Sequence, residues 1–495
     1  MGKKVIVVGG GIAGLSAGVY ARRCGFGATV LEGHSIAGGN CTSWRRGGYL
    51  FEGGMHWLTG SDKNSMLNKL WRTVGALDDS VGISTGEPFM VYDHGGTPVK
   101  VFRDVDATER SLLELSPEDA AEIKDLCDNV RKVRGLTMPV TNLRGVKMTK
   151  KSRPPLSLLF SALSAFGVMG KFSKISREQY ISRFRHEGIR DMLRSCTSDK
   201  SGIVPYFFTM GILAQGDGGF PEGGSLPFVG RIVKTFESMG GELLCNARVR
   251  RVIVENGKAV GVETADGKRM EADAVIVTVD TMAAGQLFDP PLQAPWLDKM
   301  RAVTVPTMAT FVSLGVGADL SHRPHFMVFK LREPIAVGPR KYEFLSVNNY
   351  AGDPAYSPQG KTAMTMILDG DTYDFWKQAK QQGAYADEKR QLADKVVAAL
   401  SGHMPEMDGK IEAADVATPL TYERYCGNWK GSWMTEMVPS MKMSQYPYKV
   451  DGVAGAYFAG QRIMPPGGLP VALSTGRTAV QHLCRDTGTV FVSED

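Results

Sequence analysis

The sequence predicts an α/β protein whose main sheet is completed by segments from both ends of the chain. A β-branched run at Val5–Val8 leads into a glycine-rich turn and a segment with helical spacing. Strand and helix patterns alternate again at 220–280, and residues 459–480 are predicted to form a closing strand, a second glycine-rich turn and a helix. We therefore expect a three-layer domain of the Rossmann type together with a discontinuous mixed α+β domain.

The first turn has the spacing of a dinucleotide-binding motif. Gly9, Gly11 and Gly14 follow the strand in the order G-x-G-x-x-G at the start of the predicted helix. Gly9 permits the tight turn, Gly11 lets the backbone approach a pyrophosphate, and Gly14 lets the helix pack on the strand. The helix begins at Ile12 and Ala13, where free N–H groups favour a phosphate.

An acidic residue and two glycine pairs extend this motif. Glu32 directly follows a second predicted strand, Ala28–Leu31, where a carboxylate can bind ribose hydroxyls. Two glycine pairs then flank a short predicted strand, and paired glycines permit close approach of the backbone to a flat ligand. The expected ligand contacts in this stretch are Gly38, Gly39, Asn40, Gly53, Gly54 and Met55.

The middle segment, 220–280, is predicted to return to the same domain. A helical stretch stops at Gly240-Gly241, and the strands that follow are broken at Asn256-Gly257 and Asp266-Gly267. A length of 495 residues suits two domains. We assign 1–75, 215–310 and 450–495 to the nucleotide-binding domain, and 76–214 and 311–449 to a substrate domain.

Together these motifs resemble the FAD-dependent family of carotenoid desaturases, carotenoid isomerases and retinol saturases, whose flavin domain is similar to that of amine oxidases. The resemblance rests on Glu32 followed by Gly38-Gly39, then "GYLFEGG", then a C-terminal "FAGQ…PPGGLPVAL.TGR". It implies noncovalently bound FAD. It also implies a position for each remaining contact: Val249 beside the adenine, Gly460 and Gln461 near the pyrophosphate and ribityl chain, and Gly468 and Leu469 at the flavin ring.

Two residues depart from the amine-oxidase pattern. Gln461 stands where amine oxidases usually have an acid, and Asn40 stands where they usually have an arginine. One phosphate contact is then unassigned, and Arg45 and Arg46 are the candidates for it. Asn40 and the stretch "GNWKGSW" resemble the isomerase and saturase branch more than the desaturases.

The resemblance implies an FAD-dependent oxidoreductase acting on carbon–carbon double or single bonds of a long apolar substrate, such as a carotenoid, a retinoid or another lipid. Saturation, isomerisation and desaturation are all compatible with flavin chemistry. A flavin amine oxidase and a noncatalytic FAD-binding protein are the alternatives. The single G-x-G-x-x-G motif indicates no separate nicotinamide domain, which leaves oxygen, a quinone or a partner protein to exchange electrons.

Aromatic residues gather just before the closing segment. Tyr425, Trp429 and Trp433 are expected to line a tunnel for the apolar substrate, with core packing as the alternative. His56 is the candidate proton donor, with a structural hydrogen-bonding role as the alternative. No H-E-x-x-H pattern or clustered metal ligands occur, so no metal site is predicted.

Basic residues are concentrated in one part of the chain. The net charge is +6, and residues 131–190 hold fourteen Lys or Arg against two acids. This window contains the apolar run "PLSLLFSALSAFGVM", which is too short to span a bilayer. We expect 144–177 to contact a membrane surface, with a core helix as the alternative. Nucleic acid is not expected, because no interleaved aromatic pattern accompanies the charge.

The cysteines bear on the cellular compartment. The seven cysteines form no C-x-x-C pair, which argues against a zinc ribbon or a redox dithiol. Free, buried thiols are typical of a reducing compartment. We expect a cytoplasmic protein that contacts a membrane peripherally.

Overall fold

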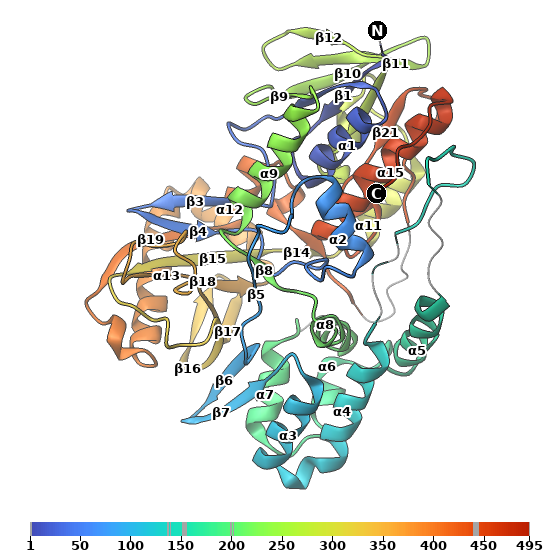
Figure 1. Cartoon of the computed structure of the whole chain (residues 1–495). Coiled ribbons are helices and arrows are strands. Elements are labelled where there is room, and N and C mark those ends of the chain that lie inside the picture. The colour runs from blue at the N-terminus through green and yellow to red at the C-terminus, as the bar shows by residue number, and fades with distance from the viewer. Residues whose placement is uncertain are drawn as a thin grey trace.

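A five-stranded parallel sheet is assembled from three distant parts of the chain (Figure 1). The structure is a computed structural model and describes residues 2–135, 138, 140–150, 156–198, 200, 202–438 and 445–494, with only the backbone at 156–162. The strand order is β21-β13-β1-β2-β9. The bounds are β1 (Lys4–Val8), β2 (Gly27–Leu31), β9 (Glu242–Leu244), β13 (Ala274–Val277) and β21 (Ala456–Phe458).

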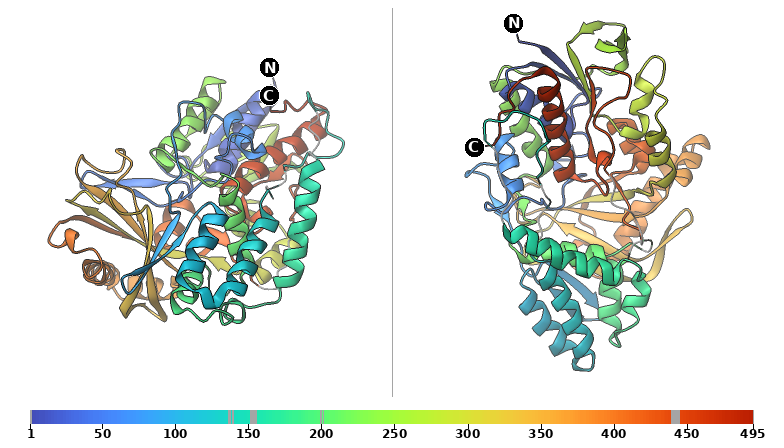
Figure 2. Two further views of the ribbon diagram at one scale, coloured as in Figure 1. Left: turned by 60° about the horizontal axis from the view of Figure 1, so that its bottom comes forward. Right: turned by 90° about the vertical axis from the view of Figure 1, so that its right-hand side faces the viewer.

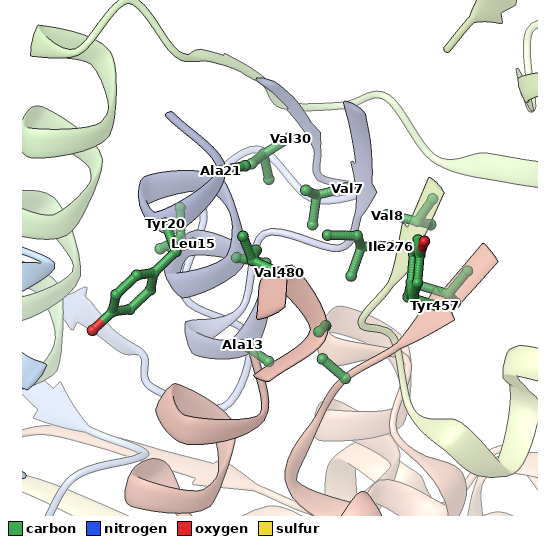
Figure 3. Packing of buried hydrophobic residues seen from close by; sticks show 14 of the residues in the cluster. Val7, Val8, Ala13, Leu15, Tyr20, Ala21, Val30, Ile276, Tyr457 and Val480 are labelled. Atoms are coloured by element: carbon green, nitrogen blue, oxygen red, sulfur yellow. The ribbon is translucent and has the colours of Figure 1, made fainter. Parts of the chain in front are cut away.

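Small residues let helices pack closely on this sheet (Figure 3). α1 (Ile12–Arg23) is buried along its first ten residues. α15 (Leu469–Thr487) crosses α1 so closely that a Cβ on Gly476 would lie 2.2 Å from the carbonyl oxygen of Ala13. α9 (Ser225–Ser238) also contacts α1. The antiparallel strands β10 (Val249–Glu255), β11 (Lys258–Thr264) and β12 (Arg269–Glu271) pack beside β13 as a third layer.

A seven-stranded mixed sheet forms the second major unit, in the order β19-β15-β18-β17-β16-β6-β7. β15 is buried at all eight positions, as expected for a strand that is covered on both faces. The bounds are β6 (Met90–His94), β7 (Thr97–Val101), β15 (Ala309–Val316), β16 (Phe326–Val337), β17 (Arg340–Asn349), β18 (Thr362–Asp369) and β19 (Ile411–Ala417).

Helices and short strand pairs complete the described part of the chain. One helical region lies beside β6 and β7 (Figure 2). Its helices are α3 (Val105–Leu115) and α7 (Glu187–Ser195), which contact these strands, and α4 (Ala120–Val133), α5 (Leu156–Phe172), α6 (Arg177–Ile181) and α8 (Val204–Ala214), which pack on the other helices. The others are α2 (Met66–Thr73), α10 (Thr281–Ala284), α11 (Pro295–Val303), α12 (Tyr373–Gln381), α13 (Tyr385–Ser401) and α14 (Pro419–Cys426). The strand pairs are β3 (Ser43–Arg46) with β4 (Tyr49–Glu52), β5 (Ile83–Ser84) with β8 (Phe220–Pro221), and β14 (Pro306–Thr307) with β20 (Met434–Thr435).

The predicted α/β class with its Rossmann-type sheet is confirmed, and the first two strands lie within one residue of their predicted bounds. The closing segment differs in detail from its prediction over 459–480. β21 ends at Phe458, before that range begins, because Gly460 turns the backbone with φ 138°. The helix continues to Thr487 and ends at Gly488, whose φ of 72° forms a left-handed C-terminal cap. The two-domain limits stay a prediction.

The predicted membrane segment includes an exposed apolar face. On α5, Leu163 and Phe166 are both 66% exposed, while Ala165, Val168 and Phe172 are buried. No helix among the described residues is long and apolar enough to cross a membrane. Residues 151–155, which include Lys151 and Arg153, lie outside the described residues.

All seven cysteines have free thiols, but the prediction that they are all buried is wrong. Cys24, Cys41, Cys127 and Cys484 are buried, whereas Cys196 is exposed and two others are half-buried. Cys196 is the C-terminal cap of α7, and its Sγ lies 3.6 Å from the Sδ of Met90.

Candidate active site

The glycine-rich turn begins at the carboxyl end of β1. Gly9 has φ 106°, and a Cβ on Gly14 would lie 1.9 Å from the carbonyl oxygen of Gly9, so both positions require glycine. Gly11 is different: a Cβ there would meet only Gly38 and Gly39, at 3.9 Å. The described chain therefore leaves open space in front of Gly11.

The start of α1 is free to bind an anion. Gly11 is its N-cap and offers no capping side chain, and no acidic residue occupies the first turn. The first backbone N–H groups of a helix have no intrahelical acceptor, and the helix dipole adds positive potential there. Gly38 donates its N–H to the carbonyl of Gly10 at 2.9 Å, which holds the Gly38-Gly39 loop beside this helix start.

Glu32 lies at the carboxyl end of β2 and faces the same turn. Its carboxylate accepts the N–H of Gly10 and the N–H of His34, each at 2.8 Å. A carboxylate has about four acceptor positions, so two contacts leave capacity for ribose hydroxyls. The structure thus brings Glu32 together with the glycine turn, as the motif predicts.

A second helix start lies in the closing turn. α15 begins after Gly468, which has φ 90° and provides no capping side chain. The N–H of Gly468 is bonded to the amide oxygen of Gln461 at 3.2 Å, and the N–H of Gly460 to the hydroxyl of Thr475 at 3.0 Å. Pro470 has no N–H and Ala472 donates its own to the carbonyl of Gly468, so Leu469 and Val471 provide the first-turn N–H groups that can meet negative charge.

The buried carboxylate of Glu52 holds the Gly53-Gly54-Met55 stretch in place by accepting backbone N–H groups from it. Glu52 is 0% exposed and accepts the N–H groups of Gly54, Met55 and Ser225 together with the hydroxyls of Ser225 and Tyr356. Burial raises the pKa of Glu52, while these donors oppose that rise. Glu52 therefore joins β4, the start of α9 and the loop after β17 at one point.

A buried ion pair was missed by the sequence analysis. Arg462 donates its Nε to Asp280 at 2.7 Å, and both side chains are 2% exposed. The other oxygen of Asp280 accepts the N–H of Trp429 at 2.8 Å, and the Arg462 Nη2 donates to Ser432. The pair lies where β13 and β21 end, so it ties the Trp429 segment to the carboxyl edge of the sheet. No motif spacing marks residues 280 and 462 as partners.

The three predicted aromatic residues have different neighbours. Tyr425 is 44% exposed and packs edge-to-face against His34 at 5.0 Å, beside the loop after Glu32. The ring of Trp429 lies under Arg462, whose Cζ is 5.9 Å from the ring centre. The backbone N–H of Trp433 donates to the carbonyl oxygen of Thr307 at 2.9 Å, and the buried indole Nε1 of Trp433 has no hydrogen-bond partner among the described residues.

His56 lies on the side of the site formed by the seven-stranded sheet. Its ring stacks on Phe311 of β15 at 5.9 Å, and its Nδ1 is 3.2 Å from the hydroxyl of Tyr350. Burial and the nearby His325 lower the pKa of His56 to about 4, so the ring is neutral at pH 7. Its buried Nε2 has no hydrogen-bond partner among the described residues.

The remaining predicted contacts have varied surroundings. The side-chain amide of Asn428 donates to Asn40, which joins the Gly38-Gly39 loop to the Trp429 segment. Val249 is buried at the start of β10. Arg45 donates to the carbonyl of Ala355, and Arg46 pairs with Asp415 at 3.3 Å. Both arginines are thus held by partners outside the glycine turn.

A groove lies at the opposite edge of the parallel sheet. It has a volume of about 460 Å³ and is lined at the amino ends of β1, β13 and β21. Ligands of open α/β sheets bind outside the carboxyl ends of the strands. We therefore place the active site at the glycine turns and not in this groove.

Comparison with known proteins assigns the family. The model of the family described as flavin containing amine oxidoreductase matches residues 12–484. The chain belongs to this family. Membership confirms the predicted FAD cofactor and the predicted class of FAD-dependent oxidoreductase.

Two curated relatives align with nearly the whole chain. The chain is 22% identical over 507 residues to a lycopene-forming phytoene desaturase of Paracoccus sp., with 98% of each protein covered. It is 23% identical over 517 residues to a chloroplastic prolycopene isomerase of Daucus carota, with 98% of this chain and 80% of the relative covered. These two names agree with the resemblance seen in the sequence.

Solved structures of similar proteins share the fold. An oxidoreductase from Methanosarcina mazei has a TM-score of 0.56 at 17% identity, with 95% of this chain and 98% of that chain covered. Wild-type putrescine oxidase bound to putrescine has a TM-score of 0.60 at 15% identity, with 98% and 99% covered.

The described residues fit the cofactor of the flavin-containing amine oxidoreductase family. Two helix starts without capping side chains or first-turn acids face the carboxyl edge of the sheet. The space before Gly11 is open, and the Glu32 carboxylate has free acceptor positions. The buried Arg462 Nη1 also has no hydrogen-bond partner among the described residues. Such groups are costly unless a ligand or water satisfies them.

Proposed function

We propose that the enzyme acts on carbon–carbon double or single bonds of a long apolar isoprenoid or similar lipid, by saturation, isomerisation or desaturation. The observation that carries the proposal is the alignment of nearly the full chain with a phytoene desaturase and a prolycopene isomerase. Bound flavin supplies hydride or electron transfer, and the protein supplies position, polarity and exclusion of water.

The proposed FAD site runs between the two helix starts. α15 crosses α1 at Gly476, eight residues after Gly468, so its start extends about 12 Å beyond the crossing at 1.5 Å per residue. The pyrophosphate would lie at α1 and the ring at α15. The residues that we assign to FAD are Gly9, Gly11, Ile12, Ala13, Gly14, Glu32, Gly38, Gly39, Asn40, Gly53, Gly54, Met55, Val249, Gly460, Gln461, Gly468 and Leu469.

The proposed substrate face is aromatic and lacks a net charge. Phe311 packs on Tyr422 at 5.3 Å and on His56, and Tyr422 donates its hydroxyl to the carbonyl of Gly53 at 2.6 Å. These rings therefore border the second glycine pair. Rigid aromatic walls can orient an apolar chain that has few polar groups of its own. Trp433 and His56 are the side chains that we assign to this face.

Two neutral side chains favour a lipid over an amine. Gln461 and Asn40 use their amide oxygens inside the protein, for Gly468 and Asn428 respectively. An amine substrate requires compensation of a positive charge or removal of its proton in a buried site. The amides of Gln461 and Asn40 carry no charge for that purpose.

Anaerobic stopped-flow absorbance of the FAD-loaded enzyme tests the proposal. We expect candidate polyenes to reduce the flavin or reoxidise the prereduced flavin, or, for an isomerase, to change geometry with no net flavin redox change. Product analysis by mass spectrometry and absorbance distinguishes the three reactions. Rapid reduction by a small amine or amino acid, with every polyene inert, would instead assign the enzyme to the amine oxidases.

Trp433→Ala should lower turnover by about tenfold or more while FAD content stays unchanged, because small displacements of a reacting carbon are expensive in rate. Trp429→Ala is the contrasting variant. Its ring packs on the flavin-side core beside Arg462, so we expect this variant to lose FAD as well. Turnover per bound flavin and the ratio of flavin to protein absorbance separate the two effects. Equal turnover of Trp433→Ala and wild type would remove Trp433 from the substrate face.

We also propose peripheral contact with a membrane surface through α5 and the basic residues near it. The exposed pair Leu163 and Phe166 is one turn apart on α5, and Lys174 is exposed just beyond its end. Exposed Lys147 and Lys150 precede the helix in sequence. Apolar side chains flanked by cations suit an anionic bilayer interface.

Leu163→Ser with Phe166→Ser should abolish most binding to vesicles that contain anionic lipid. Lys147→Gln with Lys150→Gln should weaken binding by up to about 1 kcal/mol per residue, and added salt should have the same effect on the wild type. Vesicle flotation measures the binding of each double variant and the effect of salt on the wild type. Val303→Ser, which alters an exposed apolar residue on α11, is the control. If the wild-type protein binds to vesicles of no composition, the proposed membrane contact is rejected and α5 is an ordinary surface helix.

A further inference from the structure

Two of the buried cysteines lie against each other where α1 and α15 meet. Cys24 is the C-terminal cap of α1, and Cys484 lies in the last turn of α15. The thiol of Cys484 donates a hydrogen bond to the sulfur of Cys24. Because the two residues are 460 positions apart in the sequence, no C-x-x-C spacing marks them as a pair. The fold alone brings these two thiols together.

The packing of α15 on α1 allows a covalent link between the two helices (Figure 3). The helices approach so closely that a Cβ on Gly476 would lie 2.2 Å from the carbonyl oxygen of Ala13. A disulfide requires two Cα atoms within about 7 Å of each other, a separation that helices packed in this way permit. The contact between Cys24 and Cys484 is therefore a candidate cross-link between the first helix and the last.

The surroundings of Cys24 favour its thiolate form. The hydrogen bond from Cys484 lowers the pKa of the Cys24 thiol, and burial opposes this effect. The N–H of Val492 donates to the same sulfur at 3.4 Å, and the positive charges of Arg23 and Arg477 also lower the pKa of Cys24. The thiolate is the form of cysteine that attacks an oxidant. Cys24 is therefore the more reactive member of the pair.

Cys484 has the complementary character. The hydrogen bond that it donates to Cys24, together with burial, raises the pKa of Cys484, so this thiol keeps its proton at pH 7. Cys484 is 0% exposed, whereas Cys24 is 9% exposed and directly precedes the exposed Gly25. We therefore expect a small oxidant to meet Cys24 first, with Cys484 as the second thiol that resolves the oxidised sulfur.

We propose that Cys24 and Cys484 form a disulfide when the enzyme meets hydrogen peroxide, and that a thiol reductant reverses it. The Cys24 thiolate attacks one peroxide oxygen, the O–O bond breaks, and the departing hydroxide takes up a proton to become water. The sulfur of Cys484 then attacks the sulfenic acid on Cys24. The S–S bond forms, the S–O bond breaks, and the proton of Cys484 leaves with the oxygen as a second water. The two thiols lose two electrons, which the peroxide gains.

Peptide mapping of the FAD-loaded enzyme by mass spectrometry tests the inference. After treatment with hydrogen peroxide and alkylation of the remaining thiols in denaturant, we expect a cross-linked peptide that contains Cys24 and Cys484 and is lost on reduction with dithiothreitol. The link closes a loop of nearly the whole chain, so the oxidised protein should migrate faster on a non-reducing denaturing gel. Cys127→Ser, at a buried cysteine of α4, should change neither result.

Two further variants distinguish the roles of the two thiols. In Cys484→Ser the sulfenic acid on Cys24 lacks its partner, so dimedone should label Cys24. In Cys24→Ser dimedone should not label Cys484, and neither variant should give the faster gel band. The inference is overturned if the wild type forms no such cross-link at a peroxide concentration that oxidises free glutathione in the same buffer. Labelling of Cys484 in Cys24→Ser, without labelling of Cys24 in Cys484→Ser, would also overturn it.

Discussion

Gly11→Val should give a folded protein that takes up no FAD. A Cβ at this position meets protein atoms only at 3.9 Å, so the folded chain can accommodate a side chain. The same side chain would occupy the space that we assign to the pyrophosphate, in front of the free N–H groups of α1. The expected product is colourless after purification and does not gain flavin absorbance when incubated with FAD. Its far-ultraviolet circular dichroism should match that of the apoprotein.

Gly14→Ala, three residues later, is the matched control. Its Cβ would lie 1.9 Å from the carbonyl oxygen of Gly9, so this smaller substitution should damage folding itself. Comparison of these two variants distinguishes loss of the space for the pyrophosphate from loss of packing within the protein. Normal FAD content in Gly11→Val would contradict the assignment of this turn to the pyrophosphate.

Glu52→Ala should lower the free energy of unfolding by at least about 3 kcal/mol, because each buried donor left without an acceptor costs about 1–3 kcal/mol. Five donors lose their acceptor at once, and they belong to β4, α9 and the loop that carries Tyr356. Urea unfolding of the FAD-loaded protein at a fixed FAD concentration measures the change. Flavin release should shift to lower urea together with the loss of secondary structure.

Glu423→Gln is the control for this variant. Glu423 accepts a single hydroxyl, from Tyr373, at a half-buried site, and an amide oxygen can replace that acceptor. We expect a loss below about 1 kcal/mol there, as for an ordinary hydrogen bond. A Glu52→Ala protein as stable as the wild type would show that Glu52 does not hold the three elements together.

The nucleotide side of the fold could be predicted because it depends on local rules. Gly9 and Gly14 are required by a turn and a helix contact within one stretch of six residues, and Glu32 follows the next strand. The strand periodicity before each turn is equally local. The resemblance added the closing turn around Gly460 and Gly468, which lies far away in sequence.

The polar groups between segments could not be predicted in this way. Asp280 and Arg462 meet only because β13 and β21 are neighbours in the sheet, and their spacing follows no helix or strand period. The same holds for His56, Tyr350 and His325, which come from a loop and two strand ends. The expected grouping of Tyr425 with Trp433 relied on sequence proximity, yet α14 and the short turn after it direct the two side chains to different neighbours.

The order of strands in the parallel sheet has a consequence for biosynthesis. β1 leaves the ribosome before its neighbour β13 and before β21, which follow about 270 and 450 residues later. At about 5–20 residues per second, the early glycine turn waits tens of seconds for the helix that packs on it. During that time the apolar faces of β1 and α1 lack their final partners and are open to chaperones. We therefore expect FAD to bind only after α15 has been synthesised.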